Sequence, residues 1–144
     1  MRIVLIGQAA FAKDTLSALI ENKENVVGVF CPPDKDSSKP DPVKSLSLEH
    51  SINVLQFNRM RSEDAINAFK ELEPDLCVMA FVTDIVPNQM LEYPKFGTIQ
   101  YHPSLLPEHR GPSSINWPII QGKKTTGLSI FWPDEGLDTG PILL

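Results

Sequence analysis

Arg2-Ile3-Val4-Leu5-Ile6-Gly7 opens the chain as an unbroken apolar run that stops at a glycine. This pattern is typical of a strand buried on both faces of a parallel sheet. Residues 11–19 then have helical spacing, and residues 26–31 form a second apolar run of the same kind. We expect one side of the helix to be formed by Phe11, Thr15, Leu16 and Leu19. Residues 2–31 therefore predict a βαβ unit, which is right-handed as a strong default.

The alternation of strands and helices continues through the rest of the chain. The spacing predicts helices at 43–50, at 63–72 with Ser62 as the cap, from Pro87 to Tyr93, and from Ser113 or Ser114 to Gln121. It predicts further strands at 52–57, at 76–81, in the run that enters His102, at 126–132 and at 141–144. The fold class is therefore α/β, with a mostly parallel, twisted sheet. Because a natural domain seldom stops inside a core strand, we expect residues 1–144 to be one domain that is incomplete at its C-terminal end.

The composition is that of an ordinary globular protein. Of the 144 residues, 42% are apolar and 22% are charged, and the net charge is −5. This charge offers no basic field for nucleic acid, and no apolar stretch approaches the roughly 18 residues of a membrane span. The first residues lack the pattern of a signal peptide, and Cys31 and Cys77 lie in or beside apolar runs. We therefore expect two buried free thiols, no membrane association and a cytoplasmic location.

The stretch 97–111 holds the candidate active centre. A strand-like run ends there at His102-Pro103, and proline cannot continue a central strand. His102 should therefore lie at the carboxyl edge of the sheet, where open α/β proteins bind ligands. Gln100 comes two residues earlier and so lies on the same face of the strand. Asp138, in a glycine-bracketed turn, would complete a histidine–carboxylate set suited to proton transfer near neutral pH.

Each of these residues also has a purely structural interpretation. A single histidine after a strand is often structural, and an aspartate between glycines is often an ordinary turn residue. Ser104 is better explained as a turn former than as a nucleophile, because no Gly-x-Ser-x-Gly elbow surrounds it. Arg110 can bind an anionic group, or it can simply lie on the surface.

The spacing disfavours two common kinds of cofactor. A dinucleotide fingerprint needs three glycines in the turn after the first strand, and only Gly7 fits, since Ala9 and Ala12 stand at the other two positions. His102 and His109 do not have the spacing of a metal site. We therefore expect neither NAD nor a metal in this domain. The polar, proline-rich residues 32–42 are expected to form a surface loop.

Paired motifs occur along the chain in a specific order: His102-Pro-Ser-Leu-Leu-Pro107, Arg110-Gly111, Ile115-Asn116-Trp117 and Gly136-Leu-Asp138-Thr-Gly-Pro141. Together with the opening run, Phe11 and the loop Pro33-Asp34-Lys35-Asp36, they resemble the amino-terminal catalytic domain of the 10-formyltetrahydrofolate-dependent formyltransferases. Within that superfamily the chain is most similar to the hydrolase domain of 10-formyltetrahydrofolate dehydrogenase, and next to methionyl-tRNA formyltransferase. The resemblance covers the whole chain.

The resemblance implies a Rossmann-like fold with helices on both faces of the sheet and a folate bound at its carboxyl edge. The formyl donor would be 10-formyltetrahydrofolate, with binding residues at Phe81, Val82, Thr83, Asp84, Ile85, Pro133, Asp134, Ser104 and Arg110. The catalytic residues carry over as His102, which would stabilise the oxyanion, and Asp138, which would keep the imidazole protonated. The third catalytic position is usually asparagine in the transferases and aliphatic in the hydrolase domain. Here it is Gln100, whose amide lies about one C–C bond further out than that of asparagine.

The resemblance leaves the formyl acceptor open. It implies transfer of the formyl group to an amine or its hydrolysis by water. The alternatives are a methionyl-tRNA or sugar-amine formyltransferase domain, or a non-catalytic relative that only binds folate. In each longer relative the catalytic domain continues into further C-terminal domains, so one is expected in the full-length protein here.

Overall fold

The computed structural model describes residues 1–34 and 39–144. Residues 35–38, which belong to the expected surface loop 32–42, lie outside the described residues. The chain divides into two compact units, Met1–Thr98 and Ile99–Leu144. Each is described by itself below, as unit 1 and unit 2.

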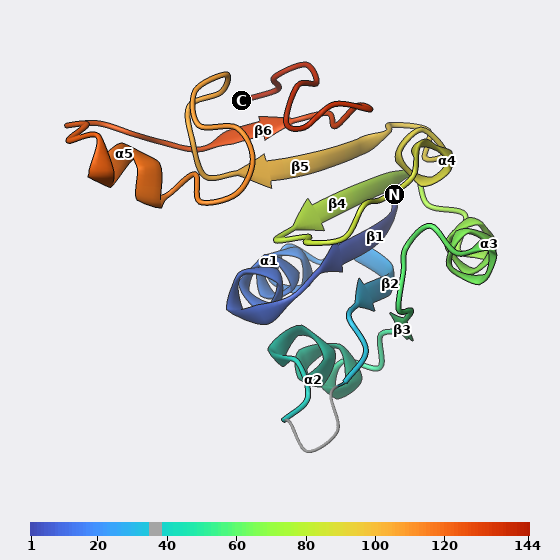
Figure 1. Ribbon diagram of the computed structural model, residues 1–144. Helices are drawn as coiled ribbons and strands as arrows, with labels where there is room; N and C mark the ends of the chain where they lie inside the picture. Colours follow the sequence, from blue (N-terminus) through green and yellow to red (C-terminus); the bar gives the residue numbers. More distant parts are fainter. Residues whose placement is uncertain (35–38) are drawn as a thin grey trace. The chain divides into compact units, whose positions relative to one another are not determined.

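Unit 1 is built from alternating strands and helices, which Figure 1 labels in chain order. The elements are β1 (Arg2–Gly7), α1 (Ala9–Glu21), β2 (Asn25–Cys31), α2 (Pro42–Glu49), β3 (Val54–Gln56), α3 (Glu63–Glu71), β4 (Leu76–Ala80) and α4 (Asn88–Leu91). The strands pair in parallel in the order β3-β2-β1-β4. This order places β1 in the middle, which explains why its sequence is apolar without alternation.

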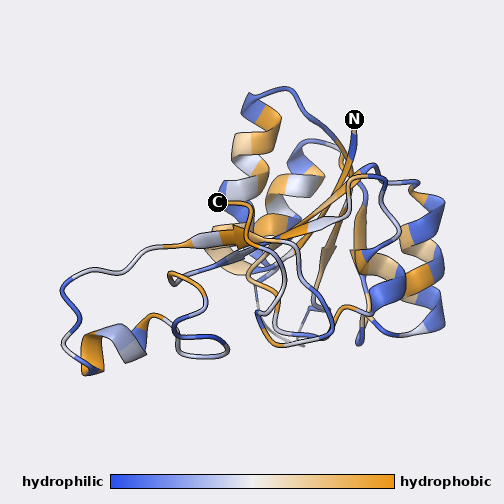
Figure 2. Ribbon diagram, turned by 90° about the horizontal axis from the view of Figure 1, so that it is seen from above, coloured by the Kyte–Doolittle hydropathy of each residue, from blue (hydrophilic) through white to orange (hydrophobic). Residues whose placement is uncertain are grey.

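Helices cover both faces of these strands, as expected. Val4 and Ile6 of β1 pack with Phe69 of α3 on one face, and Leu5 packs with Leu16 of α1 on the other. Figure 1 shows α1 and α2 on one side of β1 and β2, and α3 on the opposite side. In Figure 2 the helices carry separate hydrophilic and hydrophobic stretches, as helices that bury one face do. The prediction of an α/β fold with mostly parallel strands is confirmed.

Local signals located the helix starts of unit 1 well, but the buried side of α1 differs from the prediction. The Ser62 side chain caps α3 by accepting the N–H of Ala65 at 3.3 Å. On α1 the buried residues are Ala12 and Leu16, whereas Phe11 is exposed. The small Ala12 faces the strands because α1 runs close to β1: a Cβ on Gly7 would lie 2.8 Å from the Ala12 Cβ. A bulky residue such as phenylalanine would not fit at that position.

Unit 2 contains an antiparallel strand pair and long turns. Strand β5 (Thr98–His102) enters the unit from its boundary and pairs with β6 (Ser129–Phe131), and α5 (Asn116–Ile120) lies between them in the chain. His102 stands opposite Ser129 in this pairing. Residues 141–144 make a single antiparallel bridge, from Ile142 to Phe131, rather than the expected seventh strand.

Helix α5 is shorter than the sequence suggested, and neither serine caps it. Its N-cap residue is Ile115, which has no capping side chain. Ser113 has a φ of 63° in the left-handed region, whereas a capping residue needs extended backbone. The Ser113 carbonyl instead accepts the N–H groups of Asn116 and Trp117. Trp117 of this helix is 49% exposed.

Candidate active site

His102 is the last residue of β5, and its imidazole is buried. The chain turns at once after the strand, where the Ser104 N–H donates to the His102 carbonyl at 2.9 Å. The Nε2 atom of His102 lies 2.9 Å from the carbonyl oxygen of His109. Because a carbonyl oxygen only accepts, this contact requires a hydrogen on Nε2.

Asp138 approaches the other nitrogen of the same ring. Its Oδ2 atom lies 3.4 Å from Nδ1 of His102, and the two side chains are only 7% and 8% exposed. The same carboxylate oxygen accepts the N–H of Gly111 at 2.7 Å, and the Arg110 Nε donates to the Asp138 carbonyl at 3.0 Å. These bonds join the turn around Asp138 to the end of the loop that follows His102. The sequence therefore identified a pair of residues that the fold brings together.

Both ring nitrogens of His102 face oxygen atoms. One nitrogen faces a carbonyl oxygen and the other faces a carboxylate oxygen. Neither partner can donate a hydrogen, so both ring nitrogens have a matched partner only when each carries one. The pair can therefore present an N–H donor.

Ser104 holds the loop from inside. It is completely buried, and its hydroxyl donates to the Glu108 carbonyl at 2.6 Å. The Ser129 hydroxyl donates to the Ser104 carbonyl at 2.9 Å and accepts the Leu106 N–H at 3.1 Å. These hydrogen bonds show Ser104 as a turn former that is bonded to β6. Its burial does not support the expected contact with a folate.

Gln100 lies on β5 two residues before His102 and is half-buried. It stands opposite Phe131 of β6. Side chains alternate along a strand, so Gln100 and His102 share one face of β5. The amide of Gln100 is thus on the strand face that carries the imidazole.

The turn after β6 is organised by Asp134. Its Oδ1 atom accepts the Thr139 hydroxyl at 2.5 Å and the Gly136 N–H at 2.9 Å. These two hydrogen bonds, the Thr139 bond first, hold the pKa of Asp134 below its ordinary value of 3.8. Gly140 is needed here because a Cβ at that position would lie 1.7 Å from the Trp132 carbonyl oxygen. Pro133, also expected to contact folate, is half-buried beside Asp134.

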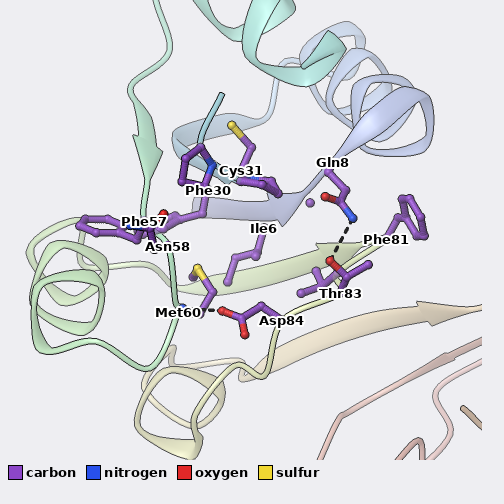
Figure 3. A pocket seen from close by; sticks show the side chains of 14 residues that line it. Ile6, Gln8, Phe30, Cys31, Phe57, Asn58, Met60, Phe81, Thr83 and Asp84 are labelled. Atoms are coloured by element: carbon purple, nitrogen blue, oxygen red, sulfur yellow. Dashed lines mark hydrogen bonds between the residues drawn. The ribbon is translucent and has the colours of Figure 1, made fainter. Parts of the chain in front are cut away.

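Unit 1 has a cavity of about 250 Å³ beyond the carboxyl ends of its strands (Figure 3). Four of the five residues that the sequence placed in a folate pocket after β4 line it: Phe81, Val82, Thr83 and Asp84. Ile85 does not line it and is exposed. The wall is completed by residues that sequence reasoning did not identify: Ile6, Gly7, Gln8, Phe30, Cys31, Pro32, Pro33, Phe57, Asn58 and Met60. Most of them lie at or just beyond the ends of β1, β2 and β3. Their position after strands was the sequence signal that could have identified them.

Three hydrogen bonds order the segment after β4. The Asp84 carboxylate accepts the N–H of Met60 at 2.7 Å and that of Ile85 at 2.9 Å. The Gln8 amide donates to the Thr83 hydroxyl at 3.2 Å, and Figure 3 shows this pair beside the cavity. The cavity therefore has fixed polar groups within a largely apolar wall.

Within residues 1–34 and 39–144, no group of three or more histidine, cysteine, aspartate or glutamate side chains could hold a metal ion. In the same part of the chain, no helix combines the length and apolar character required to cross a membrane.

Comparisons with known proteins agree on one family. The sequence model of the family described as Formyl transferase matches residues 1–144. The mitochondrial 10-formyltetrahydrofolate dehydrogenase of Mus musculus is 43% identical over the whole chain, which spans 16% of that protein's length. The methionyl-tRNA formyltransferase of Trichlorobacter lovleyi is 41% identical over 99% of the chain and 47% of its own length. A relative named as cytosolic, the 10-formyltetrahydrofolate dehydrogenase of Homo sapiens, is 41% identical over the whole chain and 16% of its own length.

Solved structures show the same fold. The phosphoribosylglycinamide formyltransferase from Bacillus halodurans superposes with a TM-score of 0.83 at 23% identity, covering 100% of this chain and 77% of that one. The glycinamide ribonucleotide transformylase 1 from Symbiobacterium toebii superposes with a TM-score of 0.82 at 20% identity, covering 100% and 71%. At these identities the likeness concerns the fold alone.

Proposed function

Because this chain belongs to the Formyl transferase family, we propose that it removes the formyl group from 10-formyltetrahydrofolate and passes it to an amine or to water. The observation that carries the proposal is the buried pair of His102 and Asp138, which can present an N–H donor. Such a donor is what the oxyanion of an acyl-transfer reaction requires.

The reaction begins with attack of the acceptor on the formyl carbon. The acceptor nitrogen or oxygen forms a bond to that carbon, the C=O electron pair moves to the oxygen, and the acceptor gives up a proton. His102 stabilises the resulting oxyanion with its N–H. The tetrahedral intermediate then collapses: the C=O bond forms again, the bond to N10 breaks, and N10 takes up a proton. Asp138 keeps the His102 ring cationic and oriented during these steps.

The His109 carbonyl has a specific part in this proposal. It accepts from Nε2 of His102 at 2.9 Å and so occupies the hydrogen bond that a formyl oxygen would need. Both acceptors are carbonyl oxygens, so the substrate can replace one with the other without changing the protonation of the ring. Burial of His102 therefore accords with a catalytic role, because the Nε2–H group exchanges one carbonyl acceptor for another.

Gln100 is the second candidate donor to the oxyanion, from the same face of β5. For the folate itself we propose contacts from the segment Phe81–Ile85 in unit 1 and, separately, from Pro133, Asp134 and Arg110 in unit 2. Asp134 and Arg110 are exposed and carry charges that can meet polar groups of a folate. Ser104 supports the loop.

The acceptor distinguishes the candidate reactions. Water as the acceptor makes the domain a hydrolase, and an amine on a tRNA or a sugar makes it a transferase. A relative that only binds folate is the non-catalytic alternative. The named relatives extend well beyond the matched part, so we propose that acceptor choice also depends on segments outside residues 1–144. We propose a cytoplasmic location, although the relatives are named as both cytosolic and mitochondrial.

The test is the loss of 10-formyltetrahydrofolate, followed with and without added amines. We expect His102→Ala to lower turnover by about 100-fold or more. His50→Ala is the matched control, since His50 is an exposed residue at the end of α2 and should leave turnover unchanged. Wild-type turnover by His102→Ala would rule out the assignment. Binding of a folate analogue by a wild-type chain that never turns over would favour the non-catalytic alternative.

A further inference from the structure

The loop between β5 and α5 places a backbone carbonyl on the ring of His102. The His109 carbonyl oxygen lies 2.9 Å from Nε2 of His102, and because it only accepts, it takes the hydrogen on that nitrogen. While this bond is formed, a substrate carbonyl cannot accept the same hydrogen. The availability of the His102 N–H group therefore depends on what holds His109 in place.

The backbone at His109 has an unfavourable conformation. Its φ is 54°, in the left-handed region, which a residue other than glycine keeps only when surrounding contacts impose it. The peptide before it is fixed, because the Ser104 hydroxyl donates to the Glu108 carbonyl at 2.6 Å. Rotation about the N–Cα bond of His109 would turn its own carbonyl away from the imidazole of His102 and leave the Ser104 bond intact.

The His109 side chain makes the contact that opposes this rotation. Its Nε2 atom lies 2.9 Å from Oε1 of Gln121, and the side chain is only 11% exposed. Gln121 is the C-cap residue of α5, and its N–H donates to the Trp117 carbonyl at 2.9 Å. The Cβ and the carbonyl carbon of His109 are attached to the same Cα, so rotation about the N–Cα bond moves both. The bond between the His109 imidazole and Gln121, called the latch below, therefore holds the carbonyl on His102.

A second contact ties the same loop to the chain after α5, but it does not oppose the rotation. Lys123 Nζ lies 3.2 Å from the Glu108 carboxylate, and the two side chains are 42% and 60% exposed. Ion pairs this exposed contribute little to stability. This pair also joins the chain before the rotating bond of His109. Lys123 thus provides a matched control for Gln121.

We propose that Gln121 is a positioning residue for His102: through the latch it holds the His109 carbonyl on Nε2, and it sets the fraction of molecules in which this N–H is free. A substrate carbonyl binds Nε2–H only in that fraction, so its apparent affinity rises in proportion to the fraction. Competition with a substrate rests on the proposed function. The latch itself does not, because it is a contact within the free chain.

The first test measures solvent exchange of the His102 Nε2 hydrogen by NMR, in the full chain labelled with 15N-histidine and without ligand. Gln121 is exposed, so Gln121→Ala removes the latch without disturbing a core. We expect exchange about 5-fold faster, which corresponds to about 1 kcal/mol. His109→Ala keeps the backbone carbonyl and should have the same effect, with no further gain in the double variant. Gln121→Glu keeps an acceptor oxygen and should exchange like the wild type.

The control and the opposing results are defined by the same measurement. Lys123→Ala should leave the exchange unchanged. Wild-type exchange in both Gln121→Ala and His109→Ala would overturn the proposal. Equal acceleration in Lys123→Ala would overturn it as well, because any contact to the loop would then have the same effect.

The second test connects the latch to turnover. Gln121→Ala should lower the KM for 10-formyltetrahydrofolate by up to about 5-fold and leave kcat unchanged, because the formyl-bound state lacks the His109 contact in either protein. A lower kcat with unchanged exchange would show a merely structural residue and overturn the proposal. Faster exchange with an unchanged KM would support the latch and contradict the use of this N–H in the proposed reaction. The two failures are therefore distinguishable.

Discussion

The carboxylate of Asp138 faces Nδ1 of His102 at 3.4 Å. The oxygen that makes this contact also accepts the Gly111 N–H at 2.7 Å. Asp138 therefore makes two separable contacts: its carboxylate faces the imidazole, and it holds the loop that precedes α5. Asparagine at position 138 retains an oxygen for the second role and loses the charge needed for the first.

We predict that Asp138→Asn and Asp138→Ala separate these roles. Asp138→Asn should lower turnover by about 100-fold, because the ring loses the carboxylate that orients it, while stability changes by less than about 1 kcal/mol. Asp138→Ala should lose similar activity and a further 1–3 kcal/mol or so of stability, since the Gly111 N–H loses its partner. Turnover and urea unfolding measure the two effects. Equal stability loss in both variants would contradict the division.

Gln100 is predicted to affect the chemical step rather than binding. Gln100→Ala removes a neutral donor from the strand face of His102, and we expect kcat to fall by about 10- to 100-fold with little change in KM. Gln89→Ala, at an exposed glutamine of α4, is the control and should have no effect. Gln100→Asn moves the amide back by about one C–C bond and should shift the balance between amine transfer and hydrolysis. An unchanged kcat in Gln100→Ala would remove Gln100 from the mechanism.

Much of unit 1 could be predicted because its signals are local. The apolar run of β1 and the Ser62 cap of α3 depend on a few neighbouring residues, and both are confirmed. The buried side of α1 could not be predicted as well, because it depends on the close approach of Ala12 to Gly7. Ser113 does not cap α5, because its φ lies in the left-handed region.

The candidate site was predicted in part. His102 was found because a strand that ends at proline marks a sheet edge, and Asp138 because glycines bracket its turn. The hydrogen bond from the Ala9 N–H to the Asp41 carboxylate, at the start of α1, has no local signal, because the two residues are far apart in the sequence. The same holds for the cavity, whose wall joins residues from four strand ends and depends on the strand order.

Gly7 is predicted to tolerate alanine poorly. A Cβ there would lie 2.2 Å from the Ala80 carbonyl oxygen, a backbone atom that cannot turn away. We expect Gly7→Ala to lower the free energy of unfolding by about 2–3 kcal/mol. Gly122→Ala is the comparison: its φ is 66° but nothing lies within 4 Å, so about 1 kcal/mol is expected. Urea unfolding of both variants checks the order, and a smaller loss in Gly7→Ala would contradict it.

The two cysteines are predicted to be unreactive in the folded chain. Burial raises the pKa of Cys77 to about 12, and burial followed by the Asp41 charge raises that of Cys31 to about 11, from an ordinary value of 9.0. The thiolate is the reactive form, so a disulfide reagent at pH 8 should modify neither thiol until urea unfolds the protein. Between about pH 9 and pH 11–12 the unfolded thiols ionise while the folded ones keep their protons. The free energy of unfolding should therefore fall as pH rises through this window. Rapid modification of the folded chain would contradict the burial of these thiols.

The turn after β6 is predicted to depend on ionised Asp134. The Thr139 hydroxyl and the Gly136 N–H lower the pKa of this exposed carboxyl, so its contribution to stability is present above its ordinary value of 3.8 and is lost as pH falls through the lowered value. Thr139→Val removes the hydroxyl at nearly constant volume and should raise the Asp134 midpoint toward its ordinary value, as followed by carbon NMR of the carboxyl. Thr139→Ser keeps the hydroxyl and should titrate like the wild type. If Thr139→Val also titrates like the wild type, the Thr139 bond does not order this turn in solution.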